Sequence, residues 1–137
     1  MSKKDEIKLN VSDVVNYTKL SGAFSSALEE VVRRNIAVEE AKNRGLTASD
    51  EELQRSADLF RQMNNLRTAD ATDEWLAGRG LTLDILENFL EENILIYELK
   101  RQLVKEYDKK EFFSTPTRKN ALIEAAYNAF LADAAAK

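Results

Sequence analysis

Apolar residues recur at spacings of three and four over most of this chain, which predicts helices. The strongest pattern covers roughly residues 83–106, where one stripe contains Leu86, Phe89, Leu90, Ile94 and Tyr97. Further apolar positions widen that stripe: Ile85, Ile96, Leu99 and Leu103. A helix that is apolar over most of its circumference usually lies at the centre of a core. We therefore predict a long central helix on which the others pack.

The same periodicity predicts shorter helices on both sides of the central one. They cover about residues 13–20, 23–43, 50–65, 72–78 and 116–135. Residues 6–11 instead alternate apolar and polar side chains, which favours a short strand or an extended arm within residues 1–11. The predicted fold class is therefore all-α, a compact domain of about five to six helices.

Local signals mark several helix ends. Ser49 and Glu52 have the spacing of a capping box, in which each side chain accepts a hydrogen bond from a free backbone N–H. Thr72 and Thr82 are predicted N-caps, because a threonine hydroxyl accepts from the first turn of a helix. Pro116 suits the first position of the last helix, where a backbone N–H is not needed.

Composition narrows the classes of function. The chain has 137 residues, which suits a single domain over 1–137. Its 20 basic and 24 acidic residues give a net charge of −4, so we expect no nucleic-acid partner, which would require a concentrated basic face. The first ten residues lack an apolar run, so we expect neither a signal peptide nor a membrane span and assign the protein to the cytoplasm.

The chain contains neither cysteine nor histidine. This composition excludes disulfides, thiol catalysis, the usual zinc ligands and the commonest general base. Paired acids such as Glu91-Glu92 are typical of a solvated helix face, because di-iron bundles normally add Glu-x-x-His ligands. We therefore predict no catalytic residue, no metal site and no cofactor.

The order of these signals resembles a known family. Residues 28–66 contain a helix ending in glycine, a capping box and an amphipathic helix, and residues 75–103 contain a short helix, a Gly-rich corner and the long helix. This arrangement resembles the helical N-terminal domain of SurA-type chaperones and parvulin-type peptidyl-prolyl isomerases. The likeness covers about residues 25–107, roughly three fifths of the chain. It implies a domain that binds or cradles polypeptide chains.

The chain also departs from that family. About thirty residues follow residue 107, too few for a parvulin domain. Parvulin sites resemble pockets that contain histidine and cysteine, which this chain lacks. The resemblance therefore carries over the fold and a polypeptide-binding role, but no isomerase activity.

We predict a non-catalytic, chaperone-like protein that holds an extended or precursor polypeptide in an apolar groove. The candidate binding residues are aromatic or methionine side chains: Phe60, Met63, Trp75, Tyr97, Phe112, Phe113, Tyr127 and Phe130. Core packing is the alternative for each of them. A small all-α enzyme or small-molecule-binding protein using a reshaped family cavity, or a structural dimerisation module, remains an alternative function, and a homodimer is left open.

Overall fold

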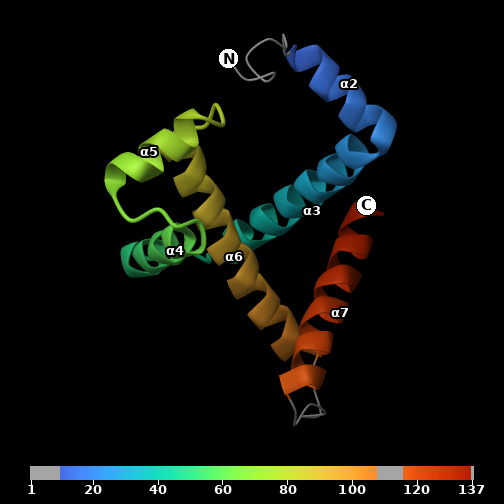
Figure 1. Cartoon of the computed structure of the whole chain (residues 1–137). Coiled ribbons are helices and arrows are strands. Elements are labelled where there is room, and N and C mark those ends of the chain that lie inside the picture. The colour runs from blue at the N-terminus through green and yellow to red at the C-terminus, as the bar shows by residue number, and fades with distance from the viewer. Residues whose placement is uncertain (1–9, 108–115, 137) are drawn as a thin grey trace, which may run out of the picture. The chain divides into compact units, whose positions relative to one another are not determined.

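The computed structural model describes residues 10–107 and 116–136, and Figure 1 shows these residues as an all-α fold. Within these residues there are helices and no strands. The helices are α2 (Val11–Ser21), α3 (Ala23–Asn43), α4 (Asp50–Met63), α5 (Ala69–Ala77), α6 (Leu83–Tyr107) and α7 (Pro116–Ala135). The predicted fold class is confirmed, and the predicted central helix is α6. No helix in the described ranges is long and apolar enough to cross a membrane.

The chain forms two units, residues 1–35 and residues 36–137, and the boundary falls within α3. In the second unit α6 packs against both α4 and α7. Its C-terminal half lies in the larger of two apolar cores, together with the end of α3 and with α7. The buried residues of this core are Ala37, Val38, Ala41, Leu95, Ile96, Leu99, Leu103, Ala126, Tyr127 and Leu131.

A smaller core joins the N-terminal half of α6 to α4 and α5. Its buried residues are Leu76, Leu86 and Leu90. Phe60 of α4 and Trp75 of α5 cover this core edge to face, with ring centroids 5.5 Å apart. The guanidinium of Arg79 lies 3.9 Å from the Trp75 ring centroid, and this cation–π contact covers the outer side of the indole.

The stripe predicted for α6 is correct in part. Leu86 and Leu90 are buried, but Ile85, Phe89 and Tyr97 remain about half exposed. The helix is apolar on several faces, so periodicity alone does not determine which face is covered. That choice depends on α4 and α5 at one end of α6 and on α3 and α7 at the other.

Helix capping explains where α4 and α5 begin. The Ser49–Glu52 capping box is present as predicted. The predicted N-cap at Thr72 is wrong, because Thr68 caps α5 by accepting a hydrogen bond from the Ala71 N–H. Thr72 instead lies buried within the helix, where its hydroxyl donates to the Thr68 carbonyl at 3.1 Å. Thr68 and Thr72 both carry a hydroxyl that can cap a helix, so residue type alone does not distinguish them.

The first unit contains α2 and the N-terminal part of α3. The extended arm predicted for residues 1–11 is wrong at its end, because α2 begins at Val11; residues 1–9 lie outside the described ranges. The Asn10 side chain accepts a hydrogen bond from the Ser12 N–H at 2.9 Å and thereby caps α2. Gly22 separates the two helices with a φ of 85°, a left-handed conformation that glycine adopts without a steric penalty. No residue of α2 is buried.

Candidate functional site

The candidate residues predicted from sequence lie in different places. Phe60 and Trp75 pack on the smaller core, and Phe130 packs on the larger one. Tyr127 is buried within the larger core, where the Lys100 ammonium lies 4.6 Å from its ring centroid. These four side chains therefore pack within or against the cores of the second unit, which is the alternative role considered for each of them.

Of the remaining four candidates, two are exposed and two lie outside the described residues. Met63 and Tyr97 are 77% and 60% exposed. Phe112 and Phe113 lie outside the described residues. Among the candidates that the structure describes, Tyr97 is the one that lines an open hollow between α4 and α6.

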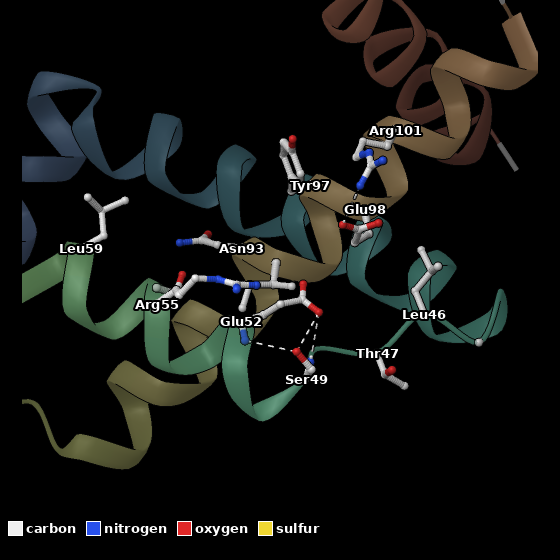
Figure 2. Close-up of a pocket in the computed structure, with 13 residues that line it drawn as sticks. Leu46, Thr47, Ser49, Glu52, Arg55, Leu59, Asn93, Tyr97, Glu98 and Arg101 are labelled. Carbon is white, nitrogen blue, oxygen red and sulfur yellow. Dashed lines mark hydrogen bonds and ion pairs between the residues drawn. The ribbon is translucent and has the colours of Figure 1, made fainter.

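That hollow is an open groove of about 870 Å³ between α4, α6 and the loop that joins α3 to α4. Figure 2 shows how side chains from α4 and α6 surround it. The lining residues are Gly45, Leu46, Thr47, Ser49, Glu52, Arg55, Ser56, Leu59, Asn93, Ile94, Tyr97, Glu98 and Arg101. We call this surface the α4–α6 groove.

The apolar part of the groove comes from residues that the two cores leave uncovered. Leu59 on α4 is 57% exposed, and Tyr97 on α6 is similarly accessible. Ile94 of α6 is half-buried and belongs to the same lining. On α4, Ser56, Leu59 and Met63 follow a spacing of three and four, so they share a helix face distinct from the core face of Ala57 and Phe60.

The negative and positive charges of the groove lining are equal in number. Glu52 and Glu98 contribute two negative charges, and Arg55 and Arg101 contribute two positive charges. Glu98 accepts a hydrogen bond from Arg101 at 3.4 Å. The Glu52 carboxylate accepts from the Ser49 N–H at 3.3 Å and from the Ser49 hydroxyl at 3.0 Å. A groove with no net charge suits a neutral ligand better than a polyanion.

An arginine network fixes one end of the groove. Arg44, next to Gly45 in the loop after α3, donates to Glu40 at 3.1 Å and to Glu106 of α6 at 2.7 Å. It also donates to Gln102 at 3.4 Å. Burial of the guanidinium lowers its pKa, but the hydrogen bonds and charges of the two glutamates outweigh burial and raise the pKa above the usual value. These contacts tie the start of the α3–α4 loop to α6.

The acidic side chains of the described residues all reach solvent at least in part. Thr72 is the one buried polar side chain among these residues, so each described carboxylate is at least partly exposed. In the same residues no three His, Cys, Asp or Glu side chains are grouped as a metal site would require. A second hollow of about 420 Å³, on another side of α4 and α6, is lined partly by Asp50, Glu87 and Glu91.

Sequence reasoning missed most of the groove. Leu59, Asn93 and Arg55 lie outside the predicted set, which consists of aromatic and methionine side chains. The available signal is Leu59, an apolar residue outside the core-facing positions of α4. The polar residues carried no signal, since isolated Asn, Ser and Arg are common on exposed helices.

Comparisons with family models, with curated proteins and with solved structures found no match to this chain.

Proposed function

We propose that this protein binds unfolded or precursor polypeptide without catalysis, in the manner expected of a SurA-type N-terminal domain. The binding site is the α4–α6 groove. The observation that carries the proposal is an open groove with no net charge that combines exposed apolar side chains with polar groups along both walls. An extended peptide presents the same combination of apolar side chains and main-chain hydrogen-bonding groups.

The dimensions of the groove fit a short peptide segment. Ser49 to Leu59 on α4 extends for about 15 Å at 1.5 Å per residue. An extended chain advances about 3.3 Å per residue, so the wall accommodates roughly four to five residues. An open groove also leaves a path for the rest of the client, whereas a small-molecule site buries most of its ligand. The geometry therefore favours a polymer over a small substrate.

The driving force for binding is burial of apolar surface. Leu59, Ile94 and Tyr97 supply this surface on the groove side. Each 100 Å² of apolar area removed from water contributes about 2.5 kcal/mol before the entropic cost of association. Ser56, Asn93 and Arg55 supply donors and acceptors for the main chain of the peptide. Contacts of this kind tolerate many sequences, so we propose broad client selection with passive release.

Titration against a permanently unfolded polypeptide tests this function. We expect a micromolar dissociation constant for a reduced, carboxymethylated client and no comparable binding to the same client in its native form. Raising salt from about 50 to about 200 mM should change the dissociation constant less than about threefold, because screening acts on exposed charges and not on apolar contacts. Absence of binding to the unfolded form, or equal binding to the native form, would refute the proposal.

A further inference from the structure

One charged side chain of the α4–α6 groove differs from the other three. The Glu52 carboxylate accepts hydrogen bonds from the N–H and the hydroxyl of Ser49. The Glu98 carboxylate accepts a hydrogen bond from Arg101. The Arg55 guanidinium, by contrast, forms no ion pair or hydrogen bond with another described residue of the second unit. Because Arg55 is exposed, its N–H groups can donate to water or to a bound client.

Arg55 lies at a defined spacing from the apolar part of the groove. Figure 2 shows it on the α4 wall, between Leu59 and Glu52. Arg55 and Leu59 are four residues apart, so they share a helix face and are separated by a rise of about 6 Å. In an extended peptide, side chains two residues apart point to the same side and lie about 6.6 Å apart along the chain.

These two spacings match. A peptide that lies along α4 can therefore place one apolar side chain against Leu59 and a second side chain, two residues away, beside Arg55. The side chain of the residue between them points away from α4. The groove wall thus pairs an apolar contact with a cationic contact at the natural period of an extended chain.

A carboxylate is the side-chain group that best fits the guanidinium of Arg55. Arginine presents its N–H donors in a planar fork that can bond both oxygens of a carboxylate, and such charge-assisted hydrogen bonds are stronger than those to neutral acceptors. We propose that the groove prefers clients in which an aspartate or glutamate lies two residues from a large apolar residue. This inference rests on the function proposed for the groove, and it adds a preference to broad client selection.

The net charge of the whole chain does not favour such clients. That charge is −4, so long-range electrostatics attract basic peptides rather than acidic ones. A preference for an acidic residue at one position must therefore come from a local contact. Because Arg55 is exposed, the contact should change the dissociation constant by about two- to fivefold. An effect of this size agrees with the weak salt dependence expected for binding as a whole.

Titration of short labelled peptides at low salt tests the preference. The first probe is a Ser/Gly-rich peptide with the central sequence Leu-Thr-Asp-Thr-Leu, whose aspartate lies two residues from a leucine in either chain direction. We expect it to bind about two- to fivefold more tightly than the same peptide with asparagine in place of aspartate, and a lysine version to bind more weakly than both.

A peptide of identical composition controls for the spacing. In the order Leu-Asp-Thr-Thr-Leu, the aspartate lies one and three residues from the two leucines, so its side chain points to the opposite side of an extended chain from both of them. This peptide should bind like the asparagine peptide. Equal binding of the two aspartate peptides would show that the groove does not select the two-residue spacing.

Charge reversal at Arg55 identifies the protein side of the contact. The variant Arg55→Glu should reverse the order, so that the lysine peptide binds more tightly than the aspartate peptide. The matched control is Arg67→Glu, which changes the net charge equally at an exposed position outside the groove lining and should keep the original order. Circular dichroism should show the same helix content in all three proteins, because both substituted positions are exposed.

The outcomes separate this preference from the binding function itself. Equal dissociation constants for the aspartate, asparagine and lysine peptides, or an unchanged peptide order in Arg55→Glu, would overturn the preference and leave the groove as a binding site. Absence of binding to every peptide and to the unfolded client would refute both proposals. The peptide series on the unmodified protein does not depend on the folding of either variant.

Discussion

Replacement of Leu99 by alanine is expected to lower the free energy of unfolding by about 2–5 kcal/mol. Leu99 is fully buried near the middle of α6, within the core that α6 shares with the end of α3 and with α7. The substitution loses the transfer free energy of the removed carbon atoms and leaves a cavity that three helices cannot readily close. The expected loss is a large fraction of the roughly 5–15 kcal/mol by which small proteins are stable.

Urea unfolding followed by circular dichroism measures this effect, and the fluorescence of Trp75, the single tryptophan, reports on the smaller core in the same experiment. Leu83→Ala is the matched control, because Leu83 belongs to the same helix and is 49% exposed. It should cost less than about 1 kcal/mol. Equal free energies of unfolding for the two variants would mean that Leu99 is not more deeply packed in the core than Leu83.

Replacement of Leu59 and Tyr97 together by serine is expected to weaken client binding at least about tenfold, equivalent to about 1.4 kcal/mol. Both side chains lie in the lining of the α4–α6 groove and both are more than half exposed. The variant removes apolar surface without adding charge, so the effect isolates the proposed driving force. Because neither side chain belongs to a core cluster, the fold should tolerate the change.

The control for this variant is Leu83→Ser/Ile85→Ser. These residues expose apolar surface of similar extent on α6, but neither lines the groove. The dissociation constant of the control for the unfolded client should stay within about twofold of the original, and both variants should keep their melting temperatures within a few degrees. Equal loss of client affinity in the two variants would indicate nonspecific binding to exposed apolar residues rather than binding in the groove.

Much of the fold was predictable because its signals are local. The bounds predicted for α3 and α7 agree with the structure, and α6 differs by one residue at its C-terminal end. The capping box at Ser49 and Glu52 specifies the start of α4 through hydrogen bonds between residues three apart. Thr82 similarly accepts from the Ile85 N–H at 3.3 Å at the start of α6. None of these interactions depends on distant parts of the chain.

The groove was less predictable because it depends on tertiary packing. The sequence shows that α6 has more apolar residues than one partner helix can cover, but not which of them remain exposed. Tyr97 was identified as a candidate for its aromatic ring, and the structure places it in the groove. Trp75 and Tyr127 were identified for the same reason and lie in cores. Residue type alone does not distinguish the two outcomes.

Photo-crosslinking from the groove tests the central claim most directly. A benzoylphenylalanine in place of Tyr97 keeps an aromatic side chain at an exposed position of the lining. Irradiation with a bound unfolded client should give a covalent adduct in high yield, and excess unlabelled client should suppress it. The same substitution at Gln62, an exposed position on α4 outside the lining, should give little adduct. A stronger adduct from residue 62, or none from residue 97 under saturating client, would contradict polypeptide binding in the α4–α6 groove.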